Sequence, residues 1–161
     1  MSFQQRLEKA IQRGQQARVA RREAEARQAL SEQELQRLHS QYRLELSDQI
    51  EKCLRQLVDH FPGFRFETVV DERGWGAAIS RDDLELRRRG GRQNSFSRLE
   101  MVIRPLSPYF VLDLAAKGAI RNKEAFNRNH YQPLADADLR SFAEMIDLWS
   151  LEYAELYAGR D

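Results

Sequence analysis

Hydrophobic residues between positions 32 and 61 recur every three or four residues, which predicts an amphipathic helix. The hydrophobic stripe comprises Leu35, Leu38, Tyr42, Leu46, Ile50, Cys53 or Leu54, Leu57 and Phe61. Pro62 and Gly63 then end the helix, because proline lacks a backbone donor and glycine permits a turn. A stripe of this length is expected to be buried against another element.

Residues 1–30 are also strong helix formers, but their hydrophobic face is weak. The larger hydrophobic residues in this stretch are Phe3, Leu7, Ile11 and Val19, and alanines among arginines follow them. Ser31 and Glu34 have the spacing of a capping box that would start a separate helix, although a serine also fits inside a continuous one. A single helix would be on the order of 90 Å long, so we expect a basic helical arm over 1–30 that projects or forms a coiled coil.

From Phe64 onward the hydrophobic period changes to two, which predicts β-strands. The inward positions are Phe64, Phe66, Thr68 and Val70, then Trp75, Ala77 and Ile79, then Leu84 and Leu86, then Leu99, Met101 and Ile103, then Phe110, Leu112 and Leu114. Reversals are predicted at 71–74, at 80–83, around Gly90 and Gly91, at 105–108 and at a tight hairpin formed by Lys117 and Gly118. Short connections favour an antiparallel meander, so we expect five or six strands between about 64 and 126.

A second amphipathic helix is predicted over residues 137–158, with Asp136 as its N-cap. Its hydrophobic stripe is Leu139, Phe142, Ile146, Trp149, Tyr153 and Leu156, and its other face is acidic. A sheet with one apolar face needs a cover, and the two amphipathic helices provide it on the same face. The predicted fold class is therefore α+β, with an arm over 1–30 and an α+β domain over 31–161 that begins with the helix at 32–61.

Charge is unevenly distributed along the 161 residues, although the net charge is only +1. Residues 1–30 and 62–134 are net basic, whereas residues 31–61 and 135–161 are net acidic. Such opposed segments can attract each other within a chain or between copies before any other partner is invoked. A lone Cys53 excludes an intrachain disulfide, and the absence of a long apolar run predicts a cytoplasmic protein without a membrane span.

Motifs that would indicate catalysis are missing from the sequence. There is no Walker A loop, no Rossmann glycine pattern, no HExxH and no GxSxG. His39 and His60 lack the partners that a zinc site requires, so we expect surface histidines on a helix. Cys53 lies among hydrophobic residues, and we expect it to be buried and to act as a small hydrophobic side chain. We therefore predict neither an enzyme nor a bound metal or cofactor.

The stretch LELRRRGGRQNSFSRLEM, residues 84–101, carries five arginines around a Gly-Gly turn. Its candidate binding residues are Arg87, Arg89, Arg92 and Arg98, which could contact phosphates while Phe96 stacks on a base. One aromatic residue is too few for a stacking platform, and Glu85 and Glu100 dilute the charge. A solvated strand face is favoured, with Arg88 sent by alternation toward the core side near the turn.

A second polar cluster occupies residues 120–132 and follows no clear period. Its candidate binding residues are Arg121, Asn122, Lys123, Asn127, Arg128, Asn129 and His130. They could bind a phosphate, a carboxylate or a peptide backbone. They could instead stabilise an irregular loop by bonding to its own backbone, and this is the favoured interpretation.

These observations favour a non-enzymatic interaction or assembly module of the adaptor or chaperone kind. An exposed helix with hydrophobic residues at coiled-coil spacing indicates a homodimer, or another protein bound through the same region. The alternative is an RNA- or DNA-binding protein that uses the hairpin at 87–98 and the first helix. A small enzyme or ligand-binding domain with a site at 121–132 is ranked below both.

Overall fold

The computed structural model describes residues 2–86 and 92–160, and its description of side chains leaves out residues 84–93. The chain divides into two compact units, Met1–Arg37 and Leu38–Asp161, and each is described by itself. The long helix α1 spans Phe3–His60 and contributes to both units. Since α1 continues through Ser31, the capping-box residues do not start a second helix.

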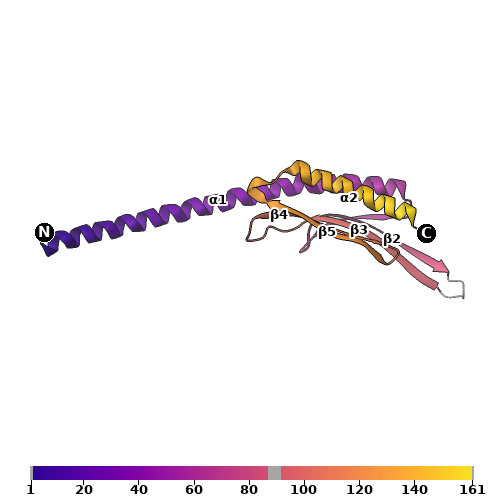
Figure 1. Cartoon of the computed structure of the whole chain (residues 1–161), viewed down its shortest axis with the longest axis horizontal. Coiled ribbons are helices and arrows are strands. Elements are labelled where there is room, and N and C mark those ends of the chain that lie inside the picture. The colour runs from indigo at the N-terminus through magenta and orange to yellow at the C-terminus, as the bar shows by residue number, and fades with distance from the viewer. Residues whose placement is uncertain (1, 87–91, 161) are drawn as a thin grey trace. The chain divides into compact units, whose positions relative to one another are not determined.

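A five-stranded antiparallel meander follows α1, as predicted (Figure 1). Its strands are β1 (Arg65–Asp71), β2 (Gly74–Leu86), β3 (Arg92–Ile103), β4 (Val111–Ile120) and β5 (Lys123–Pro133), and they lie in this order across the sheet. The turn predicted at 71–74 is present, because Asp71 and Gly74 are paired at the start of the β1–β2 ladder.

The reversal predicted at 80–83 is wrong, since β2 runs through it without interruption. Ser80 pairs with Arg98 and Asp82 with Phe96, so the backbone remains in the β2–β3 ladder. Alternation places Arg81 and Asp83 on the same face, where Arg81 Nε lies 2.8 Å from Asp83 Oδ1. The polar run is therefore a strand whose charges neutralise each other.

The hairpin predicted at Lys117 and Gly118 is also wrong, because β4 continues to Ile120 and the turn follows it. Arg121 and Asn122 have φ values of 47° and 69°, which suit a two-residue hairpin turn of the primed type. Gly118 is small for a packing reason instead: a Cβ there would lie 3.1 Å from the Phe126 ring. The last strand consequently extends to Pro133 rather than ending near 126.

The second long helix, α2, spans Leu139–Gly159. Its N-cap is Asp138, whose Oδ1 accepts a hydrogen bond from the backbone N–H of Arg140 at 3.1 Å. The predicted cap, Asp136, instead closes a short 3₁₀ turn, η1 (Leu134–Asp136). Because residues 134–136 form this turn, the helix begins later than predicted, and its N-cap lies two residues further along the chain.

Within the second unit, α2 and the part of α1 that follows Leu38 cover the same face of the sheet (Figure 1). The two helices are parallel neighbours, since Gln49 Nε2 donates to the backbone oxygen of Ala143 and the rings of Phe61 and Tyr157 lie 5.1 Å apart. Buried residues from both helices and from alternate strand positions form the core. They include Leu46, Ile50, Leu54, Ile79, Leu99, Met101, Ile103, Leu112, Leu114, Phe142, Ile146 and Tyr153.

Candidate interaction surfaces

The face of the sheet opposite the helices has a small apolar centre covered by charged side chains. Val69, Ala78 and Val102 form this centre and are buried, and Ala115 packs against them. Ala78 lies between Glu67 and Glu100 in the strand register. Because alanine is short, longer side chains from β1 and β3 can reach toward each other above it.

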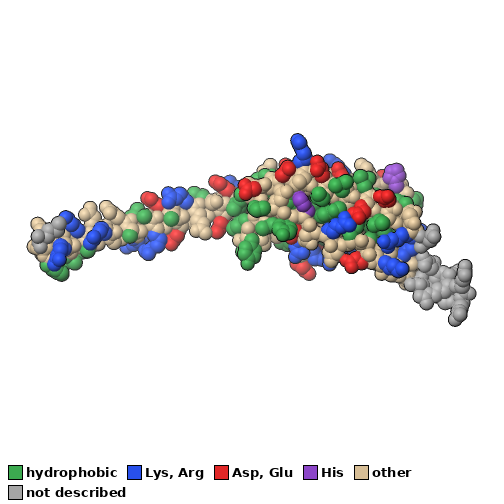
Figure 2. Space-filling view, viewed as in Figure 1, with side chains coloured by type: hydrophobic (Ala, Val, Ile, Leu, Met, Phe, Trp, Pro, Cys, Tyr) green, Lys and Arg blue, Asp and Glu red, His purple; other side chains and the backbone are tan. Residues whose placement is uncertain are grey.

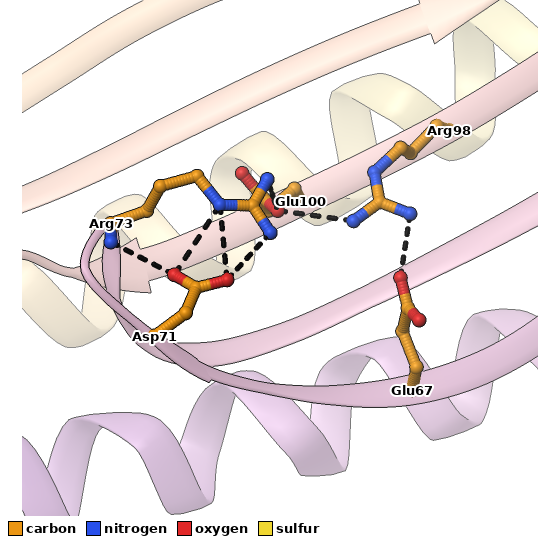
Figure 3. Close-up of polar contacts among 5 residues, drawn as sticks. All are labelled: Glu67, Asp71, Arg73, Arg98 and Glu100. Atoms are coloured by element: carbon orange, nitrogen blue, oxygen red, sulfur yellow. Dashed lines mark hydrogen bonds and ion pairs between the residues drawn. The ribbon is translucent and has the colours of Figure 1, made fainter.

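Five charged residues form a continuous network over this centre (Figure 3). Arg73, in the β1–β2 turn, contacts Asp71 Oδ2 through Nη2 and Glu100 Oε1 through Nη1, both at 2.8 Å. Arg98 Nη2 lies 3.1 Å from the same Glu100 oxygen, and its Nη1 lies 2.7 Å from Glu67 Oε1. The side-chain hydrogen bond from Arg73 lowers the pKa of Asp71 below its ordinary value. Two guanidinium groups are thus matched by three carboxylates, which leaves no net positive patch at this position.

The network borders a hollow of about 350 Å³ on the same face. Its lining includes Phe96, Lys117, Glu124 and Asn127 together with the arginines and Glu100. Its lining therefore contains both acids and bases, which does not define a ligand of one charge.

The basic hairpin is only partly described by the structure. Arg87, Arg88 and Arg89 lie outside the described residues, and so does the side chain of Arg92. The direction in which Arg88 points therefore also lies outside the description. Arg98 is described, and its two contacts to carboxylates show that it is part of the ion-pair network on the sheet.

Residues 123–132 of the polar cluster lie in strand β5, which has two distinct faces, and do not form an irregular loop. On the outer face, Asn129 donates to Asp113 Oδ1 across the strand pair at 3.1 Å, and Asn127 is exposed beside the hollow. On the helix side, Arg128 forms an ion pair with Glu152 of α2. His130 Nε2 lies 3.1 Å from Ser141 Oγ.

The turn before this strand is stabilised by its own side chains. Asn122 Oδ1 accepts from the backbone N–H of Phe96, and Nδ2 donates to the Asn94 oxygen at 2.7 Å. Arg121 Nη1 donates to the backbone oxygen of Arg160 at 2.6 Å. Lys123 is exposed at the start of β5. The predicted cluster is therefore divided among a turn, the outer face and the contact with α2, and does not converge on one point.

His39 and Cys53 differ from their predicted environments. His39 is buried rather than on the surface, and burial lowers the pKa of its imidazole below the ordinary value. Cys53 is partly buried, and its Sγ donates to Asp147 Oδ1 at 3.3 Å. Burial and that carboxylate raise the pKa of the Cys53 thiol to about 11, so it remains protonated at neutral pH. A protonated thiol is a poor nucleophile.

A groove of about 620 Å³ lies between α1 and α2, and its lining residues come from these two helices and from Phe61 directly after α1. Apolar parts of Leu57, Phe61, Leu151 and Ala154 line it, with Asp147 among the polar residues. Leu151 and the neighbouring Leu148 are exposed, one turn apart on α2. This groove was not predicted from the sequence, although a signal was visible: both leucines fall outside the core stripe of a helix whose other face is acidic.

The first unit exposes hydrophobic side chains along its helix. Phe3, Leu7, Ile11 and Val19 are all exposed large hydrophobic residues. Figure 2 shows hydrophobic and basic side chains exposed together toward the N-terminal end of this unit. An exposed apolar stripe flanked by positive charge is typical of a helix that binds another surface, either of a protein or of a membrane.

Among residues 2–86 and 92–160, no group of three or more His, Cys, Asp and Glu side chains is arranged to hold a metal ion. In that same part of the chain, no helix is both long enough and apolar enough to cross a membrane. Comparison with protein-family models, with curated proteins and with solved structures finds no match for the chain. Function is therefore inferred from the surfaces themselves.

Proposed function

We propose that this chain is a non-enzymatic protein-interaction or assembly module that associates with further copies of itself through its N-terminal helical region. The observation that carries the proposal is the exposed stripe of Phe3, Leu7 and Ile11 in a helix whose neighbouring residues are also exposed. Complete burial of one such side chain contributes about 1.5–3 kcal/mol, so three of them would offset at most the lower part of the roughly 4–15 kcal/mol that association costs, and a weak complex is expected.

Light scattering of the full chain over a range of concentrations tests this function. We expect the mass to rise above that of one chain, and the double variant Leu7→Glu/Ile11→Glu to remain a monomer. The matched control is Gln12→Glu/Gln16→Glu, which adds the same charge to the same helix on the side away from the stripe. A wild-type chain that remains a monomer at tens of micromolar, the usual range for weak complexes, would contradict the proposal.

A further inference from the structure

The groove between α1 and α2 has the dimensions of a helix-binding site. Its lining on α1 runs from Cys53 to Phe61 and on α2 from Asp147 to Ala154. At 1.5 Å per residue, each side covers about 10–12 Å, or roughly two turns of helix. The exposed surface of its lining is mainly apolar, and Leu151, which is part of that lining, is exposed to solvent. These are the features of a groove that receives the apolar face of an amphipathic helix.

The charge around the groove restricts which helix can enter. Helix α2 carries Glu144, Asp147, Glu152 and Glu155, and only one basic residue, Arg140. Glu152 is already paired with Arg128, whereas Glu144 and Glu155 are exposed. Figure 2 shows acidic side chains next to hydrophobic ones over the helical layer. A complementary occupant is therefore basic as well as amphipathic.

The N-terminal end of the chain is such a helix. Phe3, Leu7 and Ile11 are spaced four apart and cover about 12 Å, which matches the length of the groove. The same segment carries Arg6, Lys9 and Arg13 against a single acid, Glu8. Pairing of this segment with its own copy would instead bring like charges together, and its stripe is interrupted after Ile11 by Gly14 and Arg18. The groove is the better complement in both charge and hydrophobic pattern.

We infer that the segment from Phe3 to Arg13 of one copy binds in the α1–α2 groove of a second copy. This inference rests on the proposed self-association and names the surface that receives the N-terminal helix. Leu7 is the central anchor and lies against Leu151, while the basic side chains face Glu144 and Glu155. The contact is heterologous, because an N-terminal segment meets a groove rather than its own equivalent.

Complementation between two full-length variants tests the inference. Leu7→Glu/Ile11→Glu disables the N-terminal segment and keeps the groove, whereas Leu151→Lys disables the groove and keeps the segment. The matched control is Leu44→Lys, since Leu44 on α1 is 64% exposed and Leu151 is 65% exposed, but Leu44 does not line the groove. Circular dichroism establishes that each variant is folded, and Leu151→Gln replaces Leu151→Lys if the lysine variant is not.

We expect each disabled variant alone to be a monomer by light scattering, the Leu44→Lys protein to associate like wild type, and an equimolar mixture of the two disabled variants to form a one-to-one dimer. If the Leu151 variant alone associates as strongly as wild type, the groove is not the receptor, although self-association through the helix would stand. The groove is likewise not the receptor if the mixture gives no dimer, or if Leu44→Lys also dissociates the protein. A wild-type monomer would overturn the proposed function together with this inference.

Discussion

Replacing Glu100 by glutamine tests whether the ion-pair network stabilises the outer face of the sheet. The Glu100 side chain is 9% exposed and its Oε1 contacts both Arg73 and Arg98. Glutamine keeps the size and one acceptor oxygen but removes the negative charge. The variant therefore probes the two ion pairs without opening a cavity over Val69, Ala78 and Val102.

The expected loss of stability depends on which carboxylate partners the two arginines keep in the variant. Breaking a buried pair typically costs about 3–5 kcal/mol, because one charge is left buried and uncompensated. Here Arg73 is 53% exposed and keeps Asp71, while Arg98 is 25% exposed and keeps Glu67. Neither guanidinium is left without a partner, so the cost approaches that of two partly exposed pairs. We expect the free energy of unfolding to fall by about 1–2 kcal/mol.

Urea unfolding followed by circular dichroism measures this difference. With a typical slope of about 1–3 kcal/mol per molar urea, the midpoint should fall by roughly 0.3–2 M at unchanged slope. The control is Asp48→Asn, which breaks an exposed pair with Lys52 whose side chains are 64% and 72% exposed and should change stability by less than about 0.5 kcal/mol. A Glu100→Gln midpoint equal to that of the control would refute a stabilising role of the network in the sheet.

Three further outcomes are expected. Tyr153→Phe removes the buried hydroxyl that donates to the Ala119 carbonyl at 2.9 Å, and should lower the free energy of unfolding by about 1–2 kcal/mol in urea titrations. The pKa of His39 is lowered in the folded protein, so protonation of its imidazole favours the unfolded chain. The contribution of the neutral imidazole to stability is complete above about pH 6.5 and is lost as the pH falls. The urea midpoint should therefore fall less between pH 7.5 and pH 5 in His39→Gln than in the wild-type protein. At pH 8, Cys53, with its pKa of about 11 against an ordinary 9.0, should react with iodoacetamide on the order of 100-fold more slowly in the folded chain than in urea, and equal rates would contradict that pKa.

The elements of the fold were predictable because each repeats a local pattern. The spacing of three to four residues from Leu35 onward corresponds to α1 in the structure. The spacing of two after Phe64 corresponds to the strands of the sheet. The hairpin at Lys117 and Gly118 was predicted wrongly because the glycine there has a packing role, although glycine is also typical of turns. A side chain at position 118 would crowd the rings of Phe126 on β5 and Tyr153 on α2. A single sequence does not distinguish a glycine required by such packing from a glycine required by a hairpin turn.

The candidate site residues were harder to predict, because their roles depend on partners distant in sequence. Alternation correctly placed Arg98 and Glu100 on the outer face, but their shared contacts with Arg73 and Glu67 required the strand order. The sequence of residues 123–132 shows no clear period because both faces of β5 carry polar side chains. Side chains on one face contact α2, and those on the other face are exposed to solvent or contact side chains of β4. Because polar residues occur on both faces, the alternation of hydrophobic and polar residues that would indicate a strand is missing from this segment.

By itself, the sequence determined the two amphipathic helices, the antiparallel meander and the segregation of basic and acidic segments, since each follows from periodicity and composition over a short window. The tertiary structure alone decided which charges neutralise one another, why His39 is buried, and that Leu57 of α1 and Leu151 of α2 line one groove. The physical reason is that a side chain's free energy depends on its neighbours in space. Those neighbours come from elements about a hundred residues apart, as the contact between Gln49 and Asp147 illustrates.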